Sequence, residues 1–440
     1  MDQLTSGTAK RPVIICLSEA GFLLAQRLAK GIDADIHGHA LRCPQAPHHF
    51  GKARAHIANL FSSGRPIIGI CAAGILIRAV APHLQHKSSD APVLAIAESG
   101  RHVVPLIGGH HGAITLSRTV SELLAAELAM TTAGDVRWRI SLDEPPAGWR
   151  LANAGAAARV MPQLLAGDGA FLDGEALPDL NDWFAHVPRG GAVTLTATRQ
   201  QRTPTETQLV FCPQDILLGV GCARGAAADE VIDLVMAELQ TANINAASIA
   251  AVVTADIKAD EPAIHALASM LAVPLRVFDR DVLAAETDRL ESPSQVVFDE
   301  IGVHGVAEAA ALAAAGPEGK LIHPKAKSGN ATMALAQAGT FPLLALPGRK
   351  PGRVMLIGIG PGKAEWRTPE ASQMILGADE LVGYDLYIDL LGAAAAHIPR
   401  RDFKLGEEEA RCRYALESAA TGKDAVSYTH LRAHETKWHL

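Results

Sequence analysis

A repeated local pattern constrains this chain most: an apolar run, a turn that contains glycine, and a segment with helical periodicity. The pattern occurs at PVIICLS into EAGFLLAQRLAKGI, at PIIGICAAG into ILIRAVAPHL, at VVPLIGG into a helix around 116–128, and at ILLGVGCARG into AADEVIDLVMAEL. Four such junctions predict an α/β fold with parallel sheets built from βαβ units. Because open parallel sheets bind ligands at the carboxyl ends of their strands, the loops at these junctions are where we expect chemistry.

Composition divides the 440 residues into blocks. Ten of the 18 His lie between positions 37 and 111, whereas all four Tyr lie at or after position 384. Turn residues recur from 131 to 213, and Pro and Gly interrupt the pattern again at 339–352, which is typical of a joint between fused segments. We predict an N-terminal α/β domain at 11–130, an intervening subdomain or linker at 131–213, a second α/β domain at 214–338, and a further segment from 353.

Charge and hydropathy exclude several classes of protein. Forty Lys and Arg against 47 Asp and Glu give a formal charge of -7, so no overall basic field exists and nucleic acid is not an expected partner. Gly or Arg interrupts the apolar runs well before the roughly 20 residues that a membrane span requires. The six Cys are dispersed without a CxxC, which favours reduced thiols. We expect a soluble, cytoplasmic protein with no membrane partner.

Two loops of the first block carry candidate residues. GICAAGILIR places Cys71 at a strand end and Arg78 about two helical turns later. A thiol at that position is a nucleophile or a small core residue, and nothing in the sequence shows an activating partner. Arg78 suits bidentate binding of a carboxylate, although a solvated helix face explains it as well.

The second loop, ESGRHVVPLIGGHHG, holds Arg101 before a short strand and His110 and His111 after it. Paired Gly permits close backbone approach to a ligand, and imidazoles titrate near neutral pH, so one of these His suits a general base. The many His of this block raise the alternative of a metal site. No HExxH and no fixed Cys/His spacing accompanies them, so we expect no metal ligands.

Three loops of the later block are similar candidates. GVGCARG, with Arg224, is a Gly-rich turn that suits an anion, yet it is neither GxGxxG nor a phosphate-binding GxxxxGK[ST] loop. VVTADIKADE places Asp256 and Lys258 just before a helix that opens at Pro262, and a solvated turn is the alternative. KLIHPKAKSG adds Lys325 and Lys327, which suit a polycarboxylate ligand or simply solvent.

Six segments carry a family resemblance, and in chain order they are GICAAGILIRAVAPHL, GGHHG, GVGCARG, TADIKADEP, IGVHGVAEAAAL and HPKAKSG. Over residues 11 to about 338 they resemble the cobalt-precorrin-5A hydrolase family of cobalamin biosynthesis. The resemblance implies hydrolysis of the ring-A δ-lactone of a corrinoid substrate and release of acetaldehyde, with cobalt only as part of the substrate and no cofactor. Lactone hydrolysis needs a water, a base and an acid, for which His110, His111 and Asp256 are candidates. The carboxylates of the macrocycle would meet separated cations, namely Arg78, Arg101, Arg224, Lys258, Lys325 and Lys327.

From 353 to 425 the chain resembles the opening of a precorrin-3B C-17 methyltransferase of the tetrapyrrole methylase family, through RVMLIGIGPGKAEW and VGYDLY. The resemblance implies S-adenosylmethionine as the cofactor of an intact methyltransferase, a substrate-facing Tyr384, and a homodimer formed through this domain. The cofactor-binding candidates are Gly358, Gly360, Pro361 and Gly362. We therefore expect a bifunctional type of enzyme whose methyltransferase half is truncated here. Residues 426–440, which begin VSYTHLRAHET and resemble a translated sequencing adapter, are expected to be a non-native tail.

Two other functions fit the same residues. A non-catalytic corrinoid-binding module that passes an intermediate to its fused partner would bind corrinoids without releasing acetaldehyde. A metal-dependent hydrolase built on the His-rich first block would hold stoichiometric zinc.

Overall fold

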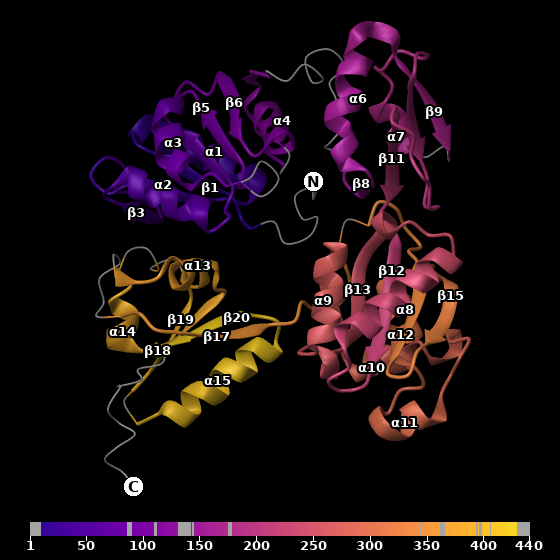
Figure 1. Cartoon of the computed structure of the whole chain (residues 1–440). Coiled ribbons are helices and arrows are strands. Elements are labelled where there is room, and N and C mark those ends of the chain that lie inside the picture. Colours follow the sequence, from indigo (N-terminus) through magenta and orange to yellow (C-terminus); the bar gives the residue numbers. More distant parts are fainter. Residues whose placement is uncertain are drawn as a thin grey trace. The chain divides into compact units, whose positions relative to one another are not determined.

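Four sheets, each combined with helices, make up the computed structural model of the chain (Figure 1). The structure describes residues 10–85, 90–109, 112–130, 142, 145–174, 178–343, 345–360, 366–392, 395, 398–404 and 406–428. The chain divides into two compact units, one of residues 9–130 with 352–440 and the other of 1–8 with 131–351. Most strand pairs are parallel, so the predicted α/β class is confirmed. No helix in the described part of the chain is long and apolar enough to cross a membrane.

The N-terminal domain has a seven-stranded sheet of order β3-β2-β1-β4-β5-β6-β7. All four residues of β1 are buried, as expected for a strand covered on both faces. Helices α2 and α3 pack on one face, while α1 contacts α4, β1 and β2. The elements are β1 (Val13–Cys16), α1 (Glu19–Ile32), β2 (Asp35–His39), β3 (His48–Phe50), α2 (Ala53–Ser62), β4 (Ile67–Ile70), α3 (Ala73–Val80), β5 (Val93–Ile96), β6 (His102–Ile107), α4 (Ala113–Leu124) and β7 (Glu127–Leu128).

Two strands of this sheet, β6 and β7, run opposite to the others. Strands β1 to β5 are parallel, but β6 is antiparallel to β5 and pairs Ile107 with Val93. The turn between them, 97–101, therefore lies at the carboxyl edge of β5, and residues after Ile107 lie at the opposite, amino edge. A Cβ added to Gly108 would lie 2.8 Å from the Cα of Pro92, just before β5. The expected parallel unit at VVPLIGG is present, because β6 leads through α4 to β7, which pairs with β6 in parallel, but a hairpin inverts this unit relative to β5.

Residues 149–213 form a four-stranded sheet of order β8-β11-β10-β9 with a core of its own, in which the rings of Trp183, Phe184 and Phe211 contact one another. This subdomain is joined to the following domain by Arg199, which donates at 2.6 Å to the buried carboxylate of Asp215. The elements are β8 (Trp149–Leu151), α6 (Ala157–Gln163), β9 (Ala170–Gly174), α7 (Pro178–Trp183), β10 (Val193–Ala197) and β11 (Gln208–Pro213).

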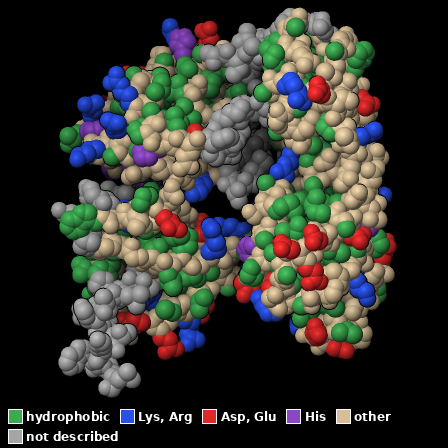
Figure 2. All heavy atoms as spheres, in the orientation of Figure 1, with side chains coloured by type: hydrophobic (Ala, Val, Ile, Leu, Met, Phe, Trp, Pro, Cys, Tyr) green, Lys and Arg blue, Asp and Glu red, His purple; other side chains and the backbone are tan. Residues whose placement is uncertain are grey.

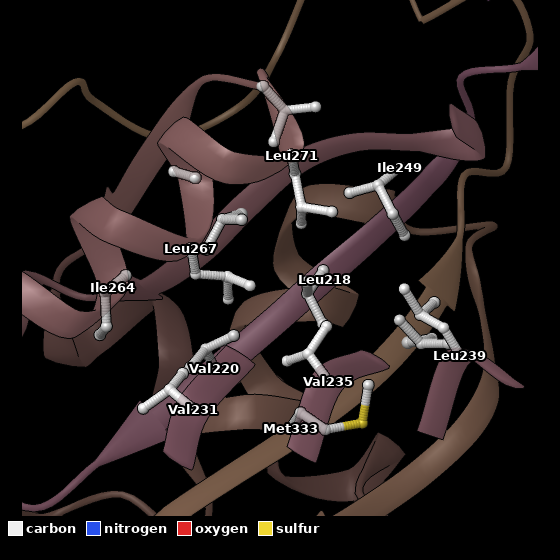
Figure 3. Close-up of a cluster of buried hydrophobic side chains, with 14 of the residues drawn as sticks. Leu218, Val220, Val231, Val235, Leu239, Ile249, Ile264, Leu267, Leu271 and Met333 are labelled. Atoms are coloured by element: carbon white, nitrogen blue, oxygen red, sulfur yellow. The ribbon is translucent and has the colours of Figure 1, made fainter. Parts of the chain in front are cut away.

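The C-terminal domain of this unit has a five-stranded sheet of order β14-β13-β12-β16-β15. Helices α8 and α9 cover one face, and Figure 3 shows Val235 and Leu267 around Leu218 in that core. Helices α10 and α12 cover the other face. The elements are β12 (Ile216–Cys222), α8 (Ala228–Thr241), β13 (Ile249–Ala255), α9 (Pro262–Leu271), β14 (Leu275–Phe278), α10 (Arg280–Ala285), α11 (Gln295–Ile301), α12 (Val306–Ala315), β15 (Lys320–Lys327) and β16 (Ala331–Gln337).

The last sheet has the order β17-β20-β18-β19, and all of its pairs are parallel. Val426 and Ser427 are buried in β20, so the expected boundary between 425 and 426 falls inside a strand, and the first residues of the expected tail belong to the sheet. The elements are β17 (Arg353–Ile357), α13 (Pro369–Gly377), β18 (Glu380–Tyr384), α14 (Asp385–Asp389), β19 (Arg400–Phe403), α15 (Glu408–Ala420) and β20 (Asp424–Tyr428).

Candidate functional site

Three loops meet at the carboxyl edge of the sheet that contains β12. Strand β12 ends at Cys222 and its parallel neighbour β13 ends at Ala255. Strand β16 is antiparallel to β12 and pairs Ala331 with Cys222, so the β15–β16 turn at 328–330 lies at the same edge. The amide of Ala223 donates to the carbonyl of Asn330 at 2.8 Å and joins the two loops. This edge, which we call the C-domain edge, brings together candidates that are more than 100 residues apart in the sequence.

Arg224 is held across the C-domain edge by the loop that follows β13. Its Nη1 lies 2.6 Å from Oδ1 of Asp260, and its Nη2 donates to the carbonyl of Ile257 at 2.8 Å. The hydrogen bond to Asp260 raises the pKa of Arg224 and lowers the pKa of Asp260. The guanidinium side chain is still 60% exposed, so it is accessible to a ligand although it is paired. Figure 2 likewise shows acidic and basic side chains interspersed over the lobe that holds α8 and α10.

Glu261 is wholly buried beneath these loops. Its Oε1 accepts from the amide of Gly225 at 2.7 Å, while its Oε2 lies 3.2 Å from Nη1 of Arg224 and 3.9 Å from Nζ of Lys258. Glu261 immediately precedes α9, but its side chain makes no capping hydrogen bond. Sequence reasoning missed this residue, because an acid directly before Pro262 is typical of a helix start.

Asp256 and Lys258 begin and end a single helical turn directly after β13. The Oδ2 atom of Asp256 lies 3.7 Å from Nη2 of Arg349, whose Nε lies 3.6 Å from Oδ1 of Asp279. Arg349 belongs to the segment 339–352 that the sequence indicates as a joint. Its backbone amide and carbonyl are both hydrogen bonded to Val277 of β14, at 3.1 and 2.9 Å. The joint is thus bound to the edge strand of the sheet and supplies a cation that no sequence pattern predicted.

The two lysines of β15 differ in their surroundings. Nζ of Lys325 donates to the carbonyl of Ser292 at 2.9 Å, and its backbone amide donates to the buried carboxylate of Glu308 at 2.8 Å. Lys327 is exposed at the end of the strand, beside the turn at the C-domain edge. Only Lys327 of this pair is therefore accessible in the manner that binding of a substrate carboxylate requires.

Cysteines lie near the carboxyl edges of both domains, and neither is activated. Burial raises the pKa of Cys71, directly after β4, to about 11. Burial and then the charge of Glu261 raise the pKa of Cys222. Since the thiolate is the nucleophile, both thiols are poor nucleophiles near neutral pH.

The structure does not gather the candidates of the N-terminal domain. Arg78 is exposed in the last turn of α3, and Arg101 is exposed in the turn between β5 and β6 at the carboxyl edge. His110 and His111 lie outside the described residues, and the preceding Gly108 lies at the amino edge. The GGHHG motif thus begins at the edge opposite Arg101, because Arg101 and Gly108 flank the single strand β6.

The residues expected to hold S-adenosylmethionine follow β17. Gly358 and Gly360 lie after this strand, and Tyr384 ends the parallel strand β18, with its ring 5.4 Å from that of Tyr387. A Cβ added to Gly358 would meet no atom within 4 Å, so the backbone there is open to a bound group. Pro361 and Gly362 lie outside the described residues.

Among the described residues, no group of three or more His, Cys, Asp or Glu could hold a metal ion. In the His-rich first block, Nδ1 of His37 lies 2.7 Å from Nε2 of His56, so these two rings contact each other.

Two family profiles match the chain. "Cobalamin synthesis G N-terminal" matches residues 55–135, and "Cobalamin synthesis G C-terminus" matches residues 216–336. The second segment contains the C-domain edge, with Arg224, Asp256, Lys258 and Glu261. Arg349 lies beyond it.

Individual proteins are also similar to this chain. "Protein CobE" of Sinorhizobium sp is 45% identical over 126 residues, which are 29% of this chain and 82% of that protein. "Cobalt-precorrin-5A hydrolase" of Priestia megaterium is 28% identical over 314 residues, which cover 65% of this chain and 82% of that protein. "Cobalamin biosynthesis protein CobIJ" of Mycobacterium bovis is 29% identical over 151 residues, 31% of this chain but only 29% of that protein. By its identity to Protein CobE and its two profile matches, the chain belongs to the cobalamin synthesis G family.

Proposed function

We propose that this chain is an enzyme of cobalamin biosynthesis, whose residues 11–338 hydrolyse the ring-A lactone of a cobalt-precorrin-5A-like corrinoid and release acetaldehyde. The observation that carries this proposal is the convergence of Asp256, Lys258 and Arg224 at the C-domain edge, within a segment matched by the cobalamin synthesis G family. Cations placed at strand ends suit the acid side chains of a corrinoid. A carboxylate beside them suits activation of water. Cobalt enters only as part of the substrate, and no cofactor is needed for hydrolysis.

Within this proposal, Asp256 is the general base. Its side chain is 30% exposed, so water and substrate reach it, and its Oδ2 lies 3.7 Å from Nη2 of Arg349. His110 and His111 are the alternative bases, offered by the other unit. Arg224 and Lys327 are accessible for binding substrate carboxylates, whereas Lys325 would first have to leave the carbonyl of Ser292. Arg78 and Arg101 are exposed candidates for the same role in the other unit, considered by itself.

We further propose that residues 353–425 are the beginning of an S-adenosylmethionine-dependent C-17 methyltransferase that acts on a precorrin. Its support is the open backbone at Gly358, the positive φ of 60° at Gly360, and Tyr384 at the same edge of an all-parallel sheet. Pro361 and Gly362 complete the proposed glycine-rich loop. The similarity to CobIJ, over 31% of this chain, points in the same direction. The cofactor would supply the methyl group, and a homodimer would form through this segment.

The hydrolase proposal is tested by anaerobic incubation of the purified chain with cobalt-precorrin-5A and enzymatic measurement of acetaldehyde. We expect release by the unmodified chain, and a decrease in rate of about 10²- to 10⁴-fold in Asp256→Asn, as for loss of a general base. Circular dichroism shows whether each variant folds. The separate variants His110→Gln and His111→Gln provide the comparison.

Three results would change the proposal. Tight corrinoid binding without acetaldehyde would make the chain a binding module. A large loss in a His variant, with Asp256→Asn unaffected, would place the base in the N-terminal domain. Stoichiometric zinc that survives dialysis, with activity lost on chelation, would favour a metal-dependent hydrolase.

A further inference from the structure

We propose that Lys258 acts at the reacting lactone carbonyl and that the buried Glu261 is its positioning residue. This inference rests on the proposed hydrolase function and assigns two roles within it. The other cations would bind peripheral carboxylates, whereas the ammonium of Lys258 would stabilise the negative charge that develops on the carbonyl oxygen.

Lys258 differs from the other candidate cations in burial and in partners. Its side chain is only 17% exposed, compared with 60% for Arg224. The nearest carboxylate oxygen that pairs with Nζ is Oε2 of Glu261, at 3.9 Å, which is beyond hydrogen-bond distance. Arg224 already donates two hydrogen bonds, to Asp260 and to Ile257. The ammonium of Lys258 is therefore largely desolvated, and its ion pair with Glu261 leaves its N–H donors available. Such a group is suited to stabilise an oxyanion as it develops.

Glu261 explains how that ammonium is kept in place. A buried carboxylate is costly unless it is paired and hydrogen bonded. One oxygen, Oε1, accepts from the amide of Gly225 and so fastens the turn after β12 to the turn after β13. The other, Oε2, is buried without a hydrogen-bond partner and lies between Arg224 and Lys258. Because Glu261 is fully buried, it does not touch substrate, and it acts through the two cations.

The chemical step balances with water as the only co-reactant. The oxygen of a water attacks the lactone carbonyl carbon while Asp256 takes a proton from it, and the π electrons move to the carbonyl oxygen beside Lys258. When the tetrahedral intermediate collapses, the ring C–O bond breaks and Asp256 returns the proton to the departing oxygen. The products of this step are the hydroxyl group and the carboxylic acid of the opened ring, which loses its remaining proton to solvent. Acetaldehyde then leaves when the new hydroxyl group gives up its proton and forms a C=O bond, while the C–C bond from its carbon to the macrocycle breaks. The electron pair of the broken bond stays on the macrocycle, which takes up one proton.

The first test compares Lys258→Met with Lys320→Met in the full chain. Lys320 is an exposed lysine at the opposite edge of the same sheet, where it pairs with Gln337. We expect Lys258→Met to lower kcat for acetaldehyde release by about 10²- to 10³-fold, the loss typical of one oxyanion donor, with little change in KM. Lys320→Met should change neither constant.

The second test is the pH profile of Glu261→Gln. Removal of the negative charge beside Lys258 makes its ammonium lose a proton at lower pH, so the alkaline limb of kcat should move to lower pH. Within the part of the chain that the structure describes, the other charged or titratable groups near Lys258 are Cys222 and Arg224 on the loop after β12 and Asp256 and Asp260 on its own loop. All four are retained in the variant. Arg349, which faces Asp256, is retained too. Glu261→Asp, which restores a carboxylate, should return the alkaline limb of kcat toward the pH at which the unmodified chain shows it.

The outcomes separate this inference from the function on which it rests. If the unmodified chain releases no acetaldehyde, both are wrong. If it does, and Lys258→Met raises KM while kcat is kept, Lys258 is a carboxylate-binding residue and this inference alone is wrong. A folded Glu261→Gln whose kcat falls equally at every pH would show that Glu261 has only a structural role.

Discussion

The two α/β regions built on the sheets β1–β7 and β12–β16 each contain antiparallel strands beside parallel ones, with opposite consequences. In the first domain β6 follows β5 through a turn of residues 97–101 and carries the chain away from the carboxyl edge. In the second domain β16 lies beside β12, and its turn with β15 returns to the carboxyl edge. The same kind of reversal thus places the start of GGHHG at the amino edge of β5 in one domain and adds the 328–330 turn to the C-domain edge in the other.

This comparison shows that strand direction decides which loops meet. Arg224 and Asp256 each follow a parallel strand and therefore lie at one edge. Arg101 and Gly108 flank a single strand and therefore lie at opposite edges. Two motifs close in sequence are separated, while motifs far apart are brought together.

The largest expected effect is on stability, when a methyl group is added to the central strand of each of these two sheets, β12 or β4. In Gly219→Ala the new Cβ would lie 1.8 Å from the backbone carbonyl oxygen of Ala307 in α12, whereas in Gly69→Ala it would lie 2.6 Å from the Cδ atoms of Leu76, which can rotate. We expect Gly219→Ala to lower the free energy of unfolding of its domain by about 3 kcal/mol or more, and Gly69→Ala by about 1 kcal/mol. Hydrogen-exchange mass spectrometry of β12 and β4 measures each domain separately, and equal losses of protection would show that α12 can move off its sheet.

A smaller effect concerns the thiols at the two edges. With a pKa of about 11, Cys71 is ionised to a fraction of only about 10⁻³ at pH 8, so we expect it to react with iodoacetamide about 100-fold more slowly than the exposed Cys412. The raised pKa of Cys222 owes part of its shift to Glu261, so Glu261→Gln should accelerate alkylation of Cys222 but not of Cys71. Peptide mapping over time provides the rates. Equal acceleration of both thiols would indicate general loosening rather than loss of one charge.

The smallest effect concerns the acid stability of the β15–β16 turn. Glu230 accepts from Oγ of Ser328 at 2.6 Å and from the amide of Asn330 at 2.7 Å, and these hydrogen bonds lower its pKa. Because the pKa is lower in the folded state, this contribution is present above the ordinary carboxyl pKa and is lost as the pH falls through the lowered value. Exchange of the Asn330 amide, corrected for its intrinsic rate, should therefore accelerate in acid. Glu230→Gln should remove that pH dependence, and its persistence would assign it to another group.

Much of the fold can be predicted from the sequence, because apolar runs and glycine turns are local. The run at 13–16 is buried at every residue, as its composition indicates. The direction of a strand is harder to predict, because the residue pattern of β6 is the same whether the strand runs parallel or antiparallel to β5. The available signal was the connection of residues 97–101, because a parallel connection needs a dozen residues or more.

The candidate site is predictable to the same extent. Arg224, Asp256 and Lys258 were candidates because each follows a strand, and parallel pairing of β12 with β13 brings them together. Glu261 was missed because it has the sequence of a helix start, while its carboxylate bonds to a turn 36 residues earlier. The position of Arg349 beside Asp256 depends on a β-bridge to Val277 of β14, and no local sequence pattern predicts such a bridge.

The attachment of Arg349 to β14 matters for anyone who isolates the second α/β domain. An excision that ends at residue 338, where the sequence pattern of the domain stops, would discard the segment that bonds both backbone groups of Val277. The shortened protein would present a bare strand to neighbouring molecules and would leave Asp256 without its guanidinium neighbour. Self-association and weakened catalysis in such a fragment would then result from the excision itself. A fragment extended through residue 351 avoids both.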